Sequence, residues 1–104
     1  MKIVKVTYTT KTAFAEQNQN NIKKVMADLQ ELNHPGINYN CCLSPDGKTF
    51  IHTAFFKSSE DEKILFGLPS FIHFQEQLKA EGIETPPKQE LLSLVGTSAN
   101  IFHS

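Results

Sequence analysis

The segment Thr49–Phe56 carries apolar side chains on both faces of the strand that it is expected to form, and no other feature constrains the fold as strongly. Successive side chains of a strand point to opposite faces. One face therefore carries Phe50, His52, Ala54 and Phe56, and the other carries Ile51, Thr53 and Phe55. A strand with one side in water would show one polar face, so this strand needs a cover on each side.

Periodicity predicts three further strands. Alternating β-branched and aromatic residues indicate a strand over the first ten residues, with Tyr8 on the same face as two valines. Another strand is predicted over Ile37–Leu43, and Ser44-Pro45-Asp46-Gly47 after it has the composition of a hairpin turn. The last strand is predicted over Glu90–Ser98. Ile83–Gln89, which contains two adjacent prolines, is expected to be an extended linker.

Two helical regions separate these strands. The first has an apolar stripe at helical spacing, formed by Ile22, Val25, Met26, Leu29 and Leu32. It is expected to stop at Asn33-His34-Pro35-Gly36, and its polar first half, residues 16–21, is expected to be more exposed. Ser59 and Glu62 have the spacing of a capping box and begin the second region, which runs to Gly82.

The order of segments is strand, helix, strand, strand, helix, strand, which is the ferredoxin-like βαββαβ motif of the α+β class. It predicts a four-stranded antiparallel sheet with both helices on one face. Residues 1–104 are enough for one domain and leave no element for the other face of the sheet. A second copy could cover it, so we predict a homodimer whose two sheets face each other as a dimeric α/β barrel.

Charge and cysteine content narrow the function classes. Ten basic and eleven acidic residues give a net charge of −1, so we expect neither nucleic acid nor a membrane surface as a partner. The start alternates in polarity, unlike a signal peptide, and no apolar run is long enough for a transmembrane helix.

Cys41 and Cys42 are adjacent, so free thiols in a cytoplasmic protein are expected. Neither a metal site nor a cofactor is predicted.

Residues Thr53 to Phe71, followed by Ile72-His73-Phe74, carry a family resemblance. The segment resembles the dimeric α/β-barrel superfamily, in particular small proteins related to antibiotic-biosynthesis monooxygenases. Many members have there a strand ending in Glu-x-Trp, an acidic helix start, a histidine and a Ser-Pro-x-Phe-like helix start. The resemblance covers nearly the whole chain in order and length, and it implies a homodimer and oxygenation without a cofactor.

The polar positions of that family pattern are apolar in this chain. Alignment on Phe71 places Phe56 at the tryptophan, Ala54 at the glutamate and Leu65 at the histidine. The haem-degrading branch is less similar, because its axial histidine would fall on Gln75. The resemblance therefore implies the fold and leaves the oxygenation chemistry open.

His52 is the chief candidate for a catalytic residue. It lies in the middle of its strand among phenylalanines, where a histidine can serve as a base or as a hydrogen-bond donor. The alternative is a core or interface histidine that a neighbour satisfies. We place the candidate pocket between the sheet and the helices. Its predicted lining is Tyr8, Tyr39, Phe50, His52, Phe56, Phe71 and Phe74. His73 is expected at the surface, and His34 has no acid at a telling spacing.

Three functions remain open at this point. One is a homodimeric protein that binds a hydrophobic small molecule, with its reaction unassigned. Another is a cofactor-independent monooxygenase acting on an aromatic or quinol substrate, which would itself react with oxygen while His52 accepts a proton. The third is a structural dimer without a ligand. The apolar residues at the Glu, Trp and His positions favour binding over oxygenation.

Overall fold

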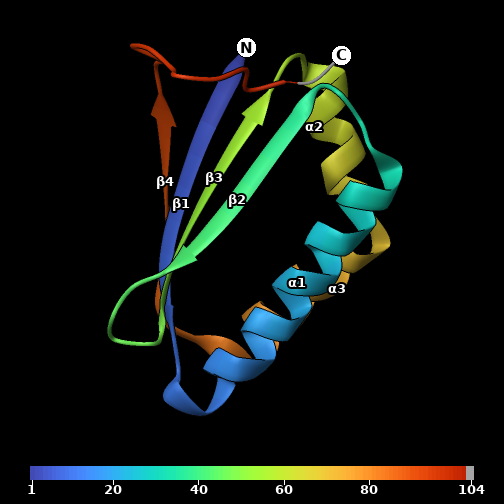
Figure 1. Cartoon of the computed structure of the whole chain (residues 1–104). Coiled ribbons are helices and arrows are strands. Elements are labelled where there is room, and N and C mark those ends of the chain that lie inside the picture. Colours follow the sequence, from blue (N-terminus) through green and yellow to red (C-terminus); the bar gives the residue numbers. More distant parts are fainter. Residues whose placement is uncertain (103–104) are drawn as a thin grey trace.

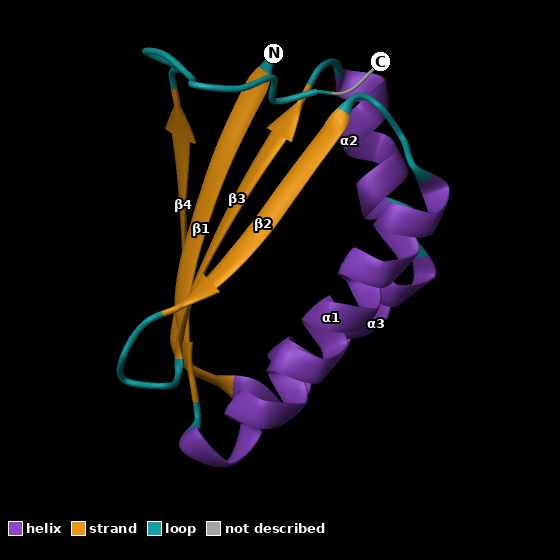
Figure 2. Cartoon of the chain, viewed as in Figure 1, coloured by secondary structure: helices purple, strands orange, loops and turns teal. Residues whose placement is uncertain are grey.

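The computed structural model describes residues 1–102 and shows one sheet covered on one face by helices (Figures 1 and 2). Its strands are all antiparallel to their neighbours, in the order β2-β3-β1-β4. The predicted ferredoxin-like βαββαβ arrangement is confirmed. The elements are β1 (Lys2–Thr10), α1 (Ala15–Leu32), β2 (Ile37–Leu43), β3 (Thr49–Phe56), α2 (Ser59–Phe66), α3 (Pro69–Gln77) and β4 (Ile83–Leu92), with a 3-10 turn (Thr12–Phe14) before α1 and a π turn (Leu78–Gly82) after α3.

The register of the sheet places His52 at its centre. In β1 its partner is Val6, and in β2 its partner is Cys41. The predicted hairpin joins β2 to β3, where the backbone N–H of Gly47 donates to the carbonyl of Ser44. Gly47 has a φ of 77°, which glycine adopts without strain. The hairpin thereby fixes which residues of β2 lie beside His52.

The predicted helix stop after α1 is also confirmed. Asn33 has left-handed backbone angles, and its N–H donates to the carbonyl of Leu29. The polar stretch at the other end of this helix is different from our expectation, because Asn18 and Asn21 are buried. The amide of Asn21 donates to the side chain of Gln77 on α3, so buried polar groups join the two helices there.

The capping box lies one residue earlier than predicted. Ser58, with an extended backbone, is the N-cap of α2, and its side chain accepts from the N–H of Asp61. The Asp61 carboxylate accepts from the Ser58 N–H in return and is also bonded to His34. Glu62 instead pairs with Lys2 of β1. No sequence spacing could have shown the acidic partner of His34, because Asp61 is distant in sequence and close in the fold.

The last strand begins and ends earlier than the prediction of Glu90–Ser98. β4 starts at Ile83 and includes both prolines, and the residues after Leu92 form no strand in the described part of the chain. β4 lies at the edge of the sheet, where a proline needs no partner for a missing N–H. The register also shifts here: two residues, Pro86 and Pro87, lie opposite Tyr8 alone, as in a β-bulge.

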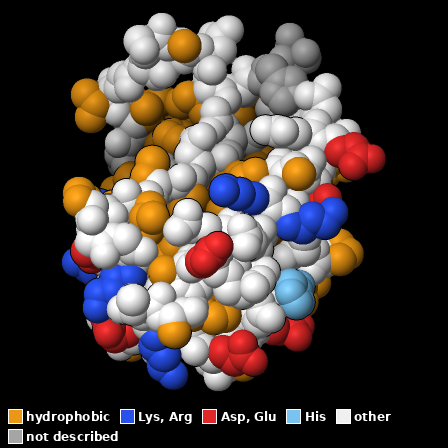
Figure 3. Space-filling view, turned by 60° about the horizontal axis from the view of Figure 1, so that its bottom comes forward, with side chains coloured by type: hydrophobic (Ala, Val, Ile, Leu, Met, Phe, Trp, Pro, Cys, Tyr) orange, Lys and Arg blue, Asp and Glu red, His pale blue; other side chains and the backbone are white. Residues whose placement is uncertain are grey.

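The core lies between the helices and the face of the sheet that carries Tyr8, Phe50 and Phe56. On the opposite face, Ile51 and Phe55 are half-buried. The segment after β4 crosses the end of the sheet toward β2 (Figure 1), where Asn38 donates to the carbonyl of Ile101. Lysines and acidic side chains are interspersed on the surface shown in Figure 3. No helix within residues 1–102 is long and apolar enough to cross a membrane.

Gly82→Ala is expected to destabilise the chain by about 1 to 3 kcal/mol, the usual cost of overpacking. A Cβ at Gly82 would lie 2.4 Å from the ring of Phe14, which packs on this glycine. Urea unfolding of the variant measures the effect. Gly96→Ala is the matched control, because a Cβ at Gly96 meets nothing within 4 Å. Equal stability of the two variants would contradict this packing argument.

Candidate functional site

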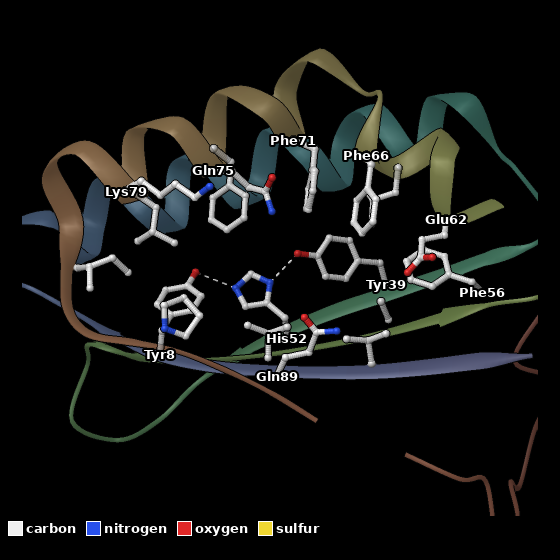
Figure 4. A pocket seen from close by; sticks show the side chains of 18 residues that line it. Tyr8, Tyr39, His52, Phe56, Glu62, Phe66, Phe71, Gln75, Lys79 and Gln89 are labelled. Atoms are coloured by element: carbon white, nitrogen blue, oxygen red, sulfur yellow. Dashed lines mark hydrogen bonds between the residues drawn. The ribbon is translucent and has the colours of Figure 1, made fainter. Parts of the chain in front are cut away.

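A cavity of about 300 Å³ lies between the sheet and the helices (Figure 4). Pockets that hold small molecules begin at about this size. The sheet lines one side through Val4, Val6, Tyr8, Tyr39, His52, Ala54, Phe56, Ile83, Pro87 and Gln89. The helical side contributes Glu62, Leu65, Phe66, Phe71, Phe74, Gln75, Leu78 and Lys79. The walls are thus mainly apolar and aromatic, with a few polar groups.

A chain of buried hydrogen bonds passes through the sheet side of this cavity. His52 is only 5% exposed and lies between two tyrosines (Figure 4). Its Nε2 atom is 2.8 Å from the hydroxyl of Tyr8, and its Nδ1 atom is 2.6 Å from the hydroxyl of Tyr39. The Nδ2 atom of Asn18 on α1 donates to the Tyr8 hydroxyl at 2.9 Å. This chain of bonds therefore joins β3, through His52, to β1 and β2, and Tyr8 extends it to α1.

The directions of these bonds follow from the need to satisfy each buried proton. Tyr8 accepts from Asn18, so its own buried O–H needs an acceptor, and the Nε2 atom of His52 is the one within reach. A neutral His52 then carries its proton on Nδ1 and donates it to the oxygen of Tyr39. The Tyr39 O–H is left as a donor, and this tyrosine lines the cavity.

Burial keeps the members of this chain uncharged. It lowers the pKa of His52 to about 4, and no carboxylate contacts the ring within residues 1–102. Burial likewise raises the pKa of both Tyr8 and Tyr39. At neutral pH the site therefore offers neutral hydrogen-bonding groups beside an apolar space, and His52 is not a cation.

Four aromatic side chains line the space opposite His52 and beside it. The rings of Phe66 and Phe71 are stacked with centroids 5.7 Å apart, and Phe71 is 5.8 Å from Phe74. Phe74 lies 5.5 Å from the ring of His52, and Phe71 meets Tyr39 edge-on. Aromatic rings favour such offset and edge contacts, so these walls offer a flat aromatic ligand similar partners.

Most of the predicted pocket residues do line the cavity. Tyr8, Tyr39, His52, Phe56, Phe71 and Phe74 all contribute to its wall. Phe50 does not. It is 1% exposed and lies in the core, stacked on the ring of Tyr8. The exposed His73 lies at the surface, as expected.

The positions that the family resemblance singled out also meet at this cavity. Ala54, Phe56 and Leu65 all line it, and so does Gln75. The further lining residues were not predicted, namely Val4, Val6, Glu62, Phe66, Leu78, Lys79, Ile83, Pro87 and Gln89. Strand alternation, which groups the two valines with Tyr8, and the helical spacing of Phe66, Leu78 and Lys79 from predicted helix residues could have suggested some of them. Asn18 was missed because a polar stretch of helix gave no sign of burial.

The two cysteines are free thiols, as predicted, and differ in environment. The Sγ atom of Cys41 lies 3.5 Å from the Nε2 atom of His52, whereas Cys42 is exposed on the other face of β2. Burial, together with the neighbouring thiol, raises the pKa of Cys41 to about 12. The described residues contain no cluster of three His, Cys, Asp or Glu side chains arranged to hold a metal ion.

At protein concentrations low enough to keep the chain monomeric, so that the sheet face carrying Cys42 is uncovered, we expect Cys42 to react with iodoacetamide at pH 8 at least ten times faster than Cys41. A thiol reacts as its thiolate, and a raised pKa leaves very little thiolate on Cys41 at this pH. Intact-mass spectra over time should show one adduct early and a second late, while protein in denaturant gains two at once. A Cys42→Ser variant that is alkylated as fast as wild type would contradict this assignment.

No protein-family model and no curated protein sequence matches the chain. Solved structures of the same fold do match. An antibiotic biosynthesis monooxygenase-type protein of Nitrosomonas europaea aligns with a TM-score of 0.77 at 15% identity, covering 92% of this chain and all of that one. One of Caulobacter crescentus gives 0.72 at 19% identity, covering 91% and 90%.

A third structure is described by its reaction. It is a mutant of SnoaB, a cofactor-independent oxygenase from Streptomyces nogalater, with a TM-score of 0.67 and 14% identity over 95% of this chain and 98% of that one. The chain thus has the ferredoxin-like fold of antibiotic biosynthesis monooxygenase-type proteins, and the resemblance predicted from the sequence is confirmed at the level of the fold. At these identities the likeness concerns the fold alone.

Proposed function

We propose that the protein is a homodimer that binds a hydrophobic, aromatic small molecule in the cavity around His52. The observation that carries this proposal is the cavity itself, in which aromatic walls enclose a small number of placed polar groups. Ligand pockets commonly combine these two features. The Tyr39 hydroxyl supplies a donor for an oxygen of the ligand, and Gln75 extends toward the same space (Figure 4).

The homodimer is proposed from the face of the sheet that the helices leave uncovered. Ile51 and Phe55 lie on that face, the exposed Leu92 shares it through its pairing with Ile3, and Val95 is exposed just beyond β4. Apolar residues gathered in this way commonly mark an interface. Sedimentation at micromolar concentration should give about twice the chain mass of 11.7 kDa. A monomer under these conditions would overturn this half of the proposal.

A second candidate function is cofactor-independent oxygenation of an aromatic or quinol substrate. SnoaB shares the fold and is an oxygenase of this kind. In such a reaction, a ring carbon that is a CH₂ group in the keto tautomer of the substrate would become a carbonyl as it takes one oxygen atom of O₂. The second oxygen atom would leave as water with the two hydrogens. The chain would supply a dry pocket and move a proton through Tyr39 and His52. Oxygen uptake with anthrone-type and quinol substrates separates this candidate from binding alone.

Ligand binding is tested by filling the cavity. Ala54 lines the sheet side of the cavity, so Ala54→Leu places three further carbon atoms where a ligand ring would lie. We expect saturable binding of 2-naphthamide, a neutral two-ring compound, to the wild type in calorimetric titrations, and binding at least ten times weaker to Ala54→Leu. Ala27→Leu, at an exposed position of α1, is the matched control. Equal binding to all three proteins would contradict a ligand site in the cavity.

A further inference from the structure

Two charged side chains line the cavity in the described part of the chain, and they lie at opposite ends of it (Figure 4). Glu62 is at the α2 end and Lys79 is at the α3 end. Glu62 is neutralised, because the Nζ atom of Lys2 lies 2.9 Å from its carboxylate. Lys79 has no ion-pair or hydrogen-bond partner within residues 1–102. The cavity therefore has one uncompensated charge, and it is positive.

Resting on the function proposed above, we infer that the ligand is a flat aromatic anion whose negatively charged oxygen group lies at Lys79. An ammonium group at the end of an apolar slot attracts a carboxylate or phenolate more strongly than a neutral group of the same shape. The lysine leaves from the turn that follows α3 and extends along the helical wall toward Gln75 (Figure 4). An anion seated there would keep its rings between His52 and the phenylalanines.

The neighbouring polar groups favour the same ligand. The Tyr39 hydroxyl and the side-chain amide of Gln75 can both donate to oxygen, and no acidic side chain other than the paired Glu62 lines the cavity in the described residues. A cationic ligand would find only that engaged carboxylate. The single uncompensated charge is positive and the Tyr39 hydroxyl is a donor, so the site matches an oxygen-rich aromatic acid or phenolate and disfavours an amine.

The test compares two probes of the same shape, 2-naphthoate and the neutral 2-naphthamide. We expect wild type to bind the naphthoate about five times more tightly at low salt, the upper end of the scale for one charge-assisted contact of an exposed lysine. In Lys79→Met this preference should disappear, while the affinity for the amide changes less than two-fold. Lys23→Met removes an exposed α1 lysine that does not line the cavity, so it should keep the preference.

The outcomes separate this inference from the function on which it rests. If the amide binds in the cavity and the naphthoate binds no better, or if the preference survives in Lys79→Met, the anion site is wrong and the aromatic pocket stands. If neither compound binds to wild type, both proposals fail. Raising the salt from 0.05 to 0.5 M should reduce the preference without affecting the amide, because screening acts on the charge alone.

Discussion

At pH 4.5 the chain is expected to be about 2 to 3 kcal/mol less stable toward unfolding than at pH 7.5, because His52 resists protonation in the folded state. Burial lowers its pKa to about 4, against an ordinary value of 6.5. The unfolded chain therefore binds the proton first as the pH falls. The contribution of neutral His52 to the free energy of unfolding is therefore fully present above about pH 6.5 and is lost progressively toward pH 4.

The hydrogen-bond chain explains why the folded site cannot adapt to a charged His52. An imidazolium would donate from both nitrogen atoms, and the Tyr8 hydroxyl, which already accepts from Asn18, would lose the acceptor for its own proton. The groups that contact the ring are two tyrosines, the Cys41 thiol and Phe74, none of which carries a negative charge at this pH. Nothing in contact with the ring compensates the cost of the cation.

Urea unfolding at both pH values, at one protein concentration, measures this effect. His52→Gln is neutral throughout and should lose most of the pH dependence, whereas His73→Gln, at an exposed position, should retain it. Asp28, Asp46 and Asp61 have pKa values below their usual range, so their contributions are lost at lower pH than this window. The same pH dependence in wild type and His52→Gln would contradict the assignment.

Removing the His52 ring is expected to have the largest effect on the function of the site. His52→Ala removes the acceptor for the Tyr8 proton and the donor to the Tyr39 hydroxyl, so we expect the affinity for 2-naphthamide to fall by roughly ten-fold, the scale of one lost buried hydrogen bond. For an oxygenase, turnover should fall about 100-fold, the usual scale for losing a group that moves a proton. Titration calorimetry and oxygen uptake give the two values.

Tyr39→Phe separates the loss of a donor from the loss of packing. It removes one hydroxyl and keeps the ring that meets Phe71 edge-on. Affinity for the amide should fall by about three- to ten-fold. His73→Ala removes an exposed histidine and should behave as wild type. Sedimentation of each variant as a dimer confirms that the fold persists. Unchanged affinity and turnover in both His52→Ala and Tyr39→Phe would show that the histidine is structural.

The fold could be predicted because the spacing of apolar residues differs clearly between segments. It is every second residue in the strands and about 3.6 residues in the helices. β2 and β3 have the predicted bounds, since a recognisable turn joins them and the alternation is strict. β4 was misplaced because its prolines indicated a linker. Only its position at the edge of the sheet, a property of the whole fold, makes the prolines acceptable there.

The sheet side of the site was predictable for a similar reason. Tyr8, Tyr39 and His52 share one face through strand parity, which requires only the order of the strands. On the helical side only Phe71 and Phe74 were predicted. Lys79 follows the predicted stripe of α3, and Asn18 belongs to a stretch with no apolar face. The local sequence pattern cannot distinguish a side-chain amide that bonds to a buried tyrosine from one that is exposed to water.

Native mass spectrometry of the purified protein, recorded before and after addition of 2-naphthamide, tests the central claim most directly. The account predicts ions of a dimer, about twice 11.7 kDa, that carry up to one small molecule for each chain. Bound compound should be lost in Ala54→Leu and retained in Ala27→Leu. A monomer, or a dimer that neither releases a co-purified compound nor takes up the amide, would contradict the account.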